Sequence, residues 1–134
     1  MFGQQKQPPI KSLIAGGTVI SGHIDFADGL RVDGHVRGNL IASKESPSLL
    51  VISETAVIVG EIYADHVIVN GAVKGPIHAA QLLELQPKAK IEGDVSYKAL
   101  EMHQGAVISG QLRPVSMMNA DDDKPVLKLA ASNA

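Results

Sequence analysis

Apolar and polar residues alternate along most of this chain, which is the period-two pattern of β-strands. A shorter pattern, aliphatic–x–Gly–x–aliphatic, is superimposed on the alternation and occurs six times, with spacings of 16, 22, 15, 18 and 17 residues between successive glycines. The six glycines are Gly22, Gly38, Gly60, Gly75, Gly93 and Gly110. Self-similarity at a short, nearly constant period is typical of a solenoid, in which each repeat buries its apolar face against its neighbours.

The repeats align into columns of apolar residues that we expect to point inward. The last two windings show the order best, because it recurs after 17 residues. The two matching series are Leu83, Leu85, Ala89, Ile91, Val95, Tyr97 and Leu100, Met102, Ala106, Ile108, Leu112, Pro114. The pattern predicts three short strands per winding and a rod of six windings about 29 Å long, at about 4.8 Å per winding.

We therefore predict an all-β fold, a single-stranded right-handed parallel β-helix of about six three-sided windings. A left-handed hexapeptide helix is the alternative, and it combines a strict coil of about 18 residues with a small residue at one of two inward positions per side. The spacings of this chain drift from 15 to 22 residues, and the inward pair Leu83 and Leu85 is large at both positions. Both observations favour the right-handed form.

Composition changes on either side of the periodic part, which runs from about residue 12 to residue 114. Residues 1–11 are polar and contain Pro8-Pro9, so we expect a flexible N-terminal arm. Residues 115–134 contain Asp121-Asp122-Asp123 and an Ala/Ser/Asn-rich end, which predicts a disordered C-terminal tail. The β-helix domain is therefore expected at residues 12–114.

Composition also limits the functional classes. The 134 residues carry a formal net charge of −2, which gives no basic surface for nucleic acid, and the chain has no cysteine for disulfides or thiolate metal sites. No apolar run approaches the roughly 20 residues of a membrane span, and the start lacks the apolar stretch of a secretory signal. We expect a cytoplasmic protein.

Candidate catalytic and cofactor-binding groups are sparse. Each of the five histidines is next to an inward aliphatic residue, so alternation turns all of them outward at different places, and we expect no three-ligand metal cluster. They are His23, His35, His66, His78 and His103. Gly16-Gly17 is not followed by the Lys-Ser/Thr of a phosphate-binding loop. We predict no catalytic, cofactor-binding or metal-binding residue, no nucleotide site and no enzyme; a small hexapeptide-type acyltransferase is the enzymatic alternative.

The two ends of such a rod are unpaired strand layers, which add further strands unless they are covered. Monomeric solenoids usually carry polar capping repeats, and none is evident here. We predict end-to-end assembly of the chain with itself through the apolar residues of the end layers. These residues are Ile20, Ile24 and Phe26 at one end and Leu100, Met102, Ile108 and Leu112 at the other. The alternative is a non-polymerising adaptor in which residues 12–17 and 115–118 fold over the ends.

Three apolar residues fall on expected outward positions, namely Val51, Val59 and Ile68. Together they form a candidate lateral or partner surface, since exposed apolar stripes mark contacts. The alternative is that they are ordinary residues of high β-propensity in exposed strand positions.

The glycine-punctuated windings, the polar proline-containing flanks, the absence of cysteine and the Met1-Phe2 start resemble the bactofilins over about residues 12–114. The resemblance implies a right-handed β-helix that polymerises without nucleotide into non-polar filaments. Such filaments scaffold cell-shape, cell-wall or polarity machinery at the bacterial inner membrane, which makes cell-wall synthesis or hydrolysis enzymes candidate partners. A non-polar filament requires a different isologous contact at each end.

The resemblance also bears on the N-terminal arm. Bactofilins often bind membrane through a short peptide that begins with an apolar pair and carries basic residues, and Met1, Phe2 and Lys6 match it as candidate membrane contacts. Burial of Met1 and Phe2 yields at best about 2–3 kcal/mol each. A single copy therefore binds weakly, and many copies on a filament bind together. The alternative is an arm without lipid contact.

Overall fold

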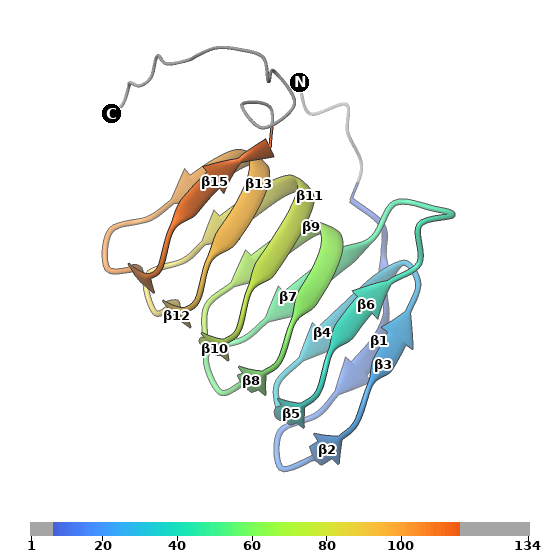
Figure 1. The fold of residues 1–134 in the computed structure, drawn as a ribbon. Coiled ribbons are helices and arrows are strands. Elements are labelled where there is room, and N and C mark those ends of the chain that lie inside the picture. Colours follow the sequence, from blue (N-terminus) through green and yellow to red (C-terminus); the bar gives the residue numbers. More distant parts are fainter. Residues whose placement is uncertain (1–6, 116–134) are drawn as a thin grey trace.

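The computed structural model describes residues 7–115, and its regular elements are fifteen strands. Figure 1 shows them wound around one axis, with the N-terminal strands at one end of the rod and the C-terminal strands at the other. All strand pairs are parallel and join neighbouring windings. The all-β solenoid of about six windings predicted from the glycine pattern is confirmed.

Each winding has three sides. The first side is a six-stranded sheet in the order β14-β12-β10-β8-β5-β2. Its strands are β2 (Val19–Ser21), β5 (His35–Arg37), β8 (Val57–Val59), β10 (Ala72–Lys74), β12 (Lys90–Glu92) and β14 (Val107–Ser109). Each strand ends just before a pattern glycine, at which the chain turns onto the second side.

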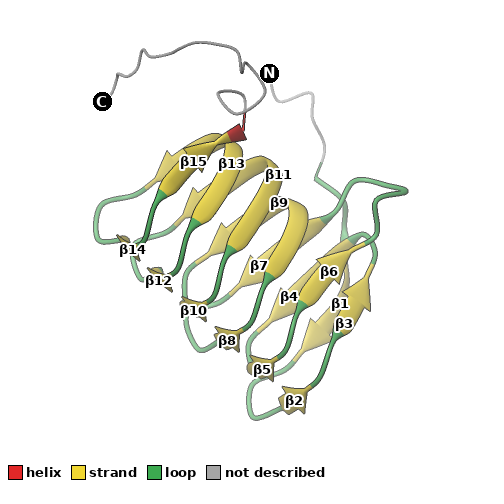
Figure 2. Cartoon of the chain, viewed as in Figure 1, coloured by secondary structure: helices red, strands yellow, loops and turns green. Residues whose placement is uncertain are grey.

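The second and third sides share one sheet of nine strands. The second side contains β3 (Ile24–Phe26), β6 (Leu40–Ala42) and β15 (Leu112–Pro114), and the third contains β1 (Ile10–Ile14), β4 (Gly29–Val32) and β7 (Leu49–Ile52). Three longer strands bend across the corner and contribute to both sides: β9 (Ile62–Val69), β11 (Ile77–Leu85) and β13 (Val95–Met102). Figure 2 shows the β6–β7 connection, residues 43–48, as a loop that extends beyond the windings.

The core is a set of stacked aliphatic columns. On the first side Val36, Ile58, Val73 and Ile91 are adjacent in register from winding to winding, and each is at most 1% exposed. The second and third sides contribute equivalent columns of buried Ile, Leu, Val and Ala residues. The apolar alternation of the sequence therefore locates the interior correctly.

The pattern glycines are required because successive backbones approach closely at this corner. Gly93 adopts φ +144°, and a Cβ atom built on it would lie 2.7 Å from the carbonyl oxygen of Gly75 in the preceding winding. Its N–H donates to the carbonyl of Ser109 in the following winding at 2.9 Å. Any other residue here would meet both an unfavourable backbone angle and a backbone clash.

The first strand begins earlier than the periodic pattern. β1 starts at Ile10 and pairs in parallel with β4, so it forms the third side of the first winding. The expected arm spans residues 1–11, of which residues 10 and 11 belong to β1. Its first six residues, with the candidate membrane contacts Met1, Phe2 and Lys6, lie outside the described residues and stay a prediction, as does the expected tail at 115–134 beyond Val115. Within residues 7–115 no helix has the length and apolarity needed to cross a membrane.

Candidate assembly surfaces at the ends of the rod

Each end of the rod is a layer of strands that pair on one side only. At the N-terminal end β1, β2 and β3 pair with β4, β5 and β6 and with no other strand of the described chain. At the C-terminal end β14 and β15 pair only with β12 and β13, and the second half of β13 pairs only with β11. Figure 1 shows these two layers facing away from each other along the axis.

The N-terminal layer contains the three residues predicted there. Ile20 lies in β2, and Ile24 and Phe26 lie in β3; all three are half-buried and pack against the core from one side. Sequence analysis missed Ile10, which the structure places in β1 of the same winding with 44% of its surface exposed. The signal was present, since Ile10 and Ile14 flank a short alternating segment, but Pro8-Pro9 placed Ile10 in the arm.

The C-terminal layer contains the other four predicted residues. Leu100 and Ile108 are half-buried against the core, whereas Met102 and Leu112 are 46% and 45% exposed. Leu85 and Val95, which precede Met102 and Leu112 in register by one winding, are fully buried. Because the described residues end after the sixth winding, the same columns that are closed inside the rod are exposed here.

Backbone hydrogen bonding is also open at this end. The N–H groups of Gly93 and Val95 donate to carbonyls one winding further on, Ser109 and Gln111, each at 2.9 Å. Gly110 and Leu112 occupy the equivalent positions in the last winding, and residues 7–115 provide no further winding to accept from them. Apolar surface and unpaired backbone donors thus coincide, which is the condition for adding a strand layer.

The described residues contain no cap at the N-terminal end. The alternative in which residues 12–17 fold over that end is wrong, because residues 12–14 continue β1 in register with β4 and Ile14 is buried in the core. At the other end Val115 follows β15 directly, and residues 116–118 lie outside the described part of the chain.

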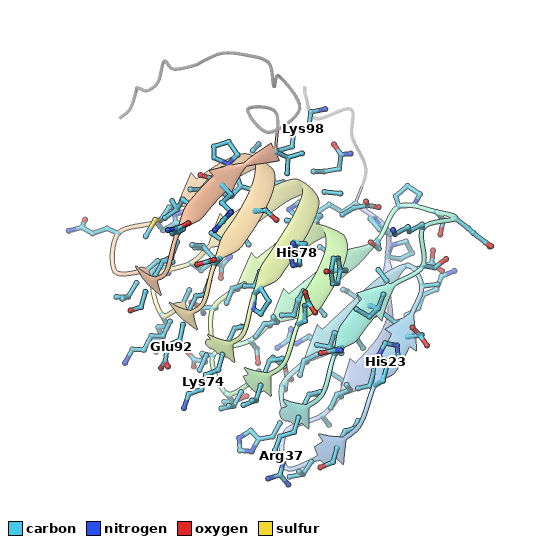
Figure 3. All side chains as sticks on the ribbon, viewed as in Figure 1. His23, Arg37, Lys74, His78, Glu92 and Lys98 are labelled. Carbon is cyan, nitrogen blue, oxygen red and sulfur yellow. The ribbon has the colours of Figure 1, made fainter. Side chains whose placement is uncertain are left out.

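The candidate lateral surface does not form one patch. Val51 and Ile68 are half-buried neighbours on the third side, in β7 and β9, but Val59 belongs to β8 on the first side. Val59 lies in register between Arg37 and Lys74, and Figure 3 shows both of those side chains projecting outward at that corner. The expected three-residue stripe is therefore wrong, because strand alternation alone cannot tell which side of a winding a residue occupies.

The histidines lie outside the core, as Figure 3 shows for His23 and His78. His78 is the most connected: its ring stacks on Tyr63 with centroids 4.2 Å apart, Nδ1 is 3.0 Å from the hydroxyl of Ser96, and Nε2 is 3.1 Å from Glu61. This row joins three windings. A catalytic serine at this place would need free backbone N–H groups nearby to stabilise an oxyanion. The N–H groups of Gly93 and Val95, near Ser96, instead donate hydrogen bonds to the next winding, so they are not available for that role.

His66 is the most enclosed histidine. Its Nε2 atom is buried and has no hydrogen-bond partner within residues 7–115, and its Nδ1 atom is 3.3 Å from the side-chain amide of Gln7. Burial lowers the pKa of the His66 imidazole, and the charges of Glu84 and Glu101 act in the opposite direction. The neutral form of His66 is thus the one that the folded chain favours.

One three-ligand cluster contradicts the expectation that there would be none. Glu84, Glu101 and His103 bring their ligand atoms within 4.8 Å of one another on the third side. Glu84 and Glu101 are adjacent in register, and His103 follows Glu101 by two residues. The prediction compared only the positions of the five histidines with one another, whereas the stacked windings bring His103 next to two carboxylates. His103 Nε2 is 3.6 Å from the half-buried Glu84 carboxylate and 3.7 Å from the exposed Glu101 carboxylate, which is the geometry of a partly exposed ion pair when the imidazole is protonated.

Comparison with known proteins bears on what these ends do. A family model described as "Bactofilin: Polymer-forming cytoskeletal" matches residues 12–113. Two curated relatives are from Myxococcus xanthus (strain DK1622). Bactofilin BacO is 29% identical over 101 residues, which are 75% of this chain and 77% of the relative. Bactofilin BacP is 26% identical over 101 residues, which are 75% of this chain and 40% of the relative.

The matched part therefore spans less than half of BacP and most of BacO. No solved structure matches the chain significantly. The family match begins in β1 and ends in β15, so it takes in every winding between the two end layers. The chain belongs to the bactofilin family of polymer-forming cytoskeletal proteins.

Proposed function

We propose that this chain polymerises end to end, without nucleotide, into filaments on the cytoplasmic face of the inner membrane, where they organise cell-shape, cell-wall or polarity machinery. The observation that carries the proposal is the pair of end layers that residues 7–115 leave open, whose aliphatic residues continue the core columns. Family membership supports the general class, a polymer-forming cytoskeletal protein.

Stacking one end layer on another closes the core. Full burial of a Leu or Ile side chain is worth about 1.5–3 kcal/mol, and the C-terminal layer alone offers Leu100, Met102, Ile108 and Leu112 in partly buried states. Unpaired backbone donors gain partners in the same step. Association itself costs about 4–15 kcal/mol. Assembly therefore needs the apolar contacts and backbone hydrogen bonds of the whole layer, and a single charge placed in that layer should weaken it strongly.

The membrane and partner parts of the proposal rest on the resemblance. Met1, Phe2 and Lys6 are too few to hold one copy on a lipid surface, but a filament displays them repeatedly and so binds by avidity. Lipid binding should therefore require polymerisation. Filaments held in this way provide a surface on which cell-wall synthesis or hydrolysis enzymes can gather.

The test places arginine in one end layer at a time, with Phe26→Arg at the N-terminal end and Leu112→Arg at the C-terminal end. If each end makes an isologous contact, each single variant forms dimers through its intact end and the double variant is monomeric. Val107→Arg is the matched control, because Val107 lies in the last winding, is 51% exposed and points outward on the first side.

Negative-stain electron microscopy and analytical ultracentrifugation, without nucleotide or metal, give the result. Filaments from the wild type and from Val107→Arg, with dimers from the single end variants, support the proposal. Unchanged filaments from both end variants contradict it. Co-sedimentation with anionic vesicles then tests the membrane part: the wild type should pellet with lipid, and both the Phe2→Ser variant and the double end variant should remain in solution.

A further inference from the structure

A recess runs along the corner between the second and third sides. The column at this corner reads Phe26, Ala42, Ala64, Ala79, Tyr97 and Pro114 from winding to winding. Large side chains occupy its ends, and alanines occupy the three central windings. Together with outward side chains of β9 and β11 and with the 43–48 loop, these alanines line a cavity of about 400 Å³ whose surface is mainly apolar.

The walls of this recess are well defined. On one side the 43–48 loop is fixed to β9 by two hydrogen bonds: the Ser48 N–H donates to the Asp65 carboxylate at 3.0 Å, and the Asp65 N–H donates to the Ser48 hydroxyl at 2.9 Å. On the other side the stacked rings of Tyr63 and His78 form the wall. A recess with such walls is largely formed before anything binds in it.

The chain itself leads into this recess. Val115, the last described residue, lines it together with Ala80, and nineteen residues follow Val115. Met117 and Met118 come two and three residues later. Methionine is unbranched and flexible, and it fills irregular apolar spaces better than other side chains.

We propose that this recess is the docking site of the chain's own C-terminal segment, with Met117 and Met118 lying over the alanine column and Asp121–Asp123 reaching Lys44. The segment then runs back along the corner, parallel to the axis of the rod. The end layer with Leu100 and Met102 stays open, so the docked segment does not block assembly.

The lengths agree with this path. Val115 follows β15 in the sixth winding and Lys44 follows β6 in the second, so four steps of about 4.8 Å separate them, or about 19 Å. Six extended residues at about 3.3 Å each cover about 20 Å, which brings Asp121 level with Lys44. Three carboxylates would then meet the exposed ammonium group of Lys44 at the far end of the recess.

The absence of cysteine from the chain allows a disulfide test in the full-length protein. Ala80 is exposed in the fourth winding, about 10 Å from Val115, which is also the reach of three extended residues. The double variant Ala80→Cys/Met118→Cys should therefore oxidise to an intramolecular disulfide at least about tenfold faster than Val107→Cys/Met118→Cys, in which the first cysteine is on another side. Mass spectrometry of mixed isotope-labelled protein separates links within a chain from links between chains.

Two further pairs distinguish other arrangements. Faster oxidation of Met102→Cys/Met118→Cys would show that the segment covers the end layer, and faster oxidation of Phe2→Cys/Ala80→Cys would assign the recess to the N-terminal arm. Either result, or equal rates for all pairs, overturns the proposal.

Side-chain chemistry is tested in the Ala80→Cys/Met118→Cys background. Met117→Ser should slow disulfide formation several-fold, and Lys44→Glu should slow it roughly two- to fivefold, with recovery on Asp121→Lys/Asp122→Lys. Rates unaffected by these changes would mean that the segment only passes the recess, and would overturn the docking proposal. None of these readouts depends on filament formation, so this proposal and the scaffold proposal fail separately.

Discussion

The central and terminal windings are built from the same residues but differ in exposure. Ile58 and Ile91 on the first side are 0% and 1% exposed, whereas Ile20 and Ile108, which occupy the same column at the two ends, are only half-buried. Residue type cannot cause this difference, because all four are isoleucine in equivalent strands. The number of neighbouring windings causes it, as expected for a fold in which each repeat contacts only the next one.

The comparison shows that the assembly surfaces of this protein are the core columns, which are exposed at the two ends of the rod. A substitution inside the rod should act on folding, and the same substitution at an end should act on association. Stability comparisons are best made in the Phe26→Arg/Leu112→Arg background, since assembly adds to the apparent stability of the wild type.

The largest effect is expected from a charge placed in the central column. Ile58→Arg buries a guanidinium without a partner, which costs several kcal/mol of a total stability of about 5–15 kcal/mol, so the chain should not fold. Ile108→Arg should fold, because its side chain can reach solvent, and should lose only the contact at the C-terminal end. Circular dichroism and ultracentrifugation of the two variants check this. Equal loss of structure in both would show that the end winding is not an opened core.

Truncation of the same column gives the next largest effect. Ile91→Ala should lower the free energy of unfolding by about 2–5 kcal/mol, since a closed cavity remains. Ile20→Ala should cost less than half as much, because Ile20 contacts the core from one side and no closed cavity forms. Urea denaturation measures both values, and a loss for Ile20→Ala equal to that for Ile91→Ala would refute the contrast.

Substitution of a pattern glycine should have a smaller effect on stability, and Gly17 provides the control. Gly93→Ala should cost about 1–3 kcal/mol, because its new Cβ atom meets the Gly75 carbonyl and φ is +144°. Gly17 also has a positive φ, +89°, but nothing lies within 4 Å of a Cβ built there. Gly17→Ala should therefore cost less, about 1 kcal/mol, since only the backbone angle is unfavourable there. Similar losses in thermal unfolding would mean that backbone angle, and not the close approach of windings, selects the pattern glycines.

The smallest effect is a dependence on pH. Burial lowers the pKa of His66, so the folded state favours the neutral imidazole. Its contribution to stability is fully present above the ordinary value of about 6.5 and is lost as pH falls below it, because the unfolded chain then binds the extra proton. The melting temperature should fall from pH 7.5 to pH 5.5, and His66→Gln should reduce that fall. An unchanged slope in the variant would argue against burial of His66.

Much of the fold could be predicted from the sequence because its determinants are local. The glycine spacing and the strand alternation identify the windings, and the columns ending at Ile20 and Leu112 identify the end layers. What alternation alone could not provide is which side chains meet across windings. The 17-residue repeat already sets Glu84 opposite Glu101, but it did not reveal that the His103 side chain lies beside both carboxylates, and alternation did not reveal that Val59 is on another side from Val51.

The corner recess shows a second limit of the sequence. Ala42, Ala64 and Ala79 look like ordinary small core residues, and nothing in the sequence shows that they line one cavity. Its volume depends on the 43–48 loop, whose connection to Asp65 is a tertiary contact with no sequence signature.

The most direct test of the assembly account is the axial advance per subunit in electron micrographs of the purified full-length chain, prepared without nucleotide. Six windings at about 4.8 Å predict filaments that advance about 29 Å per subunit, because end layers stack with the spacing of ordinary windings. Discrete monomers or trimers, or filaments with a clearly different advance per subunit, would contradict the claim that the open ends of the core are the assembly surfaces.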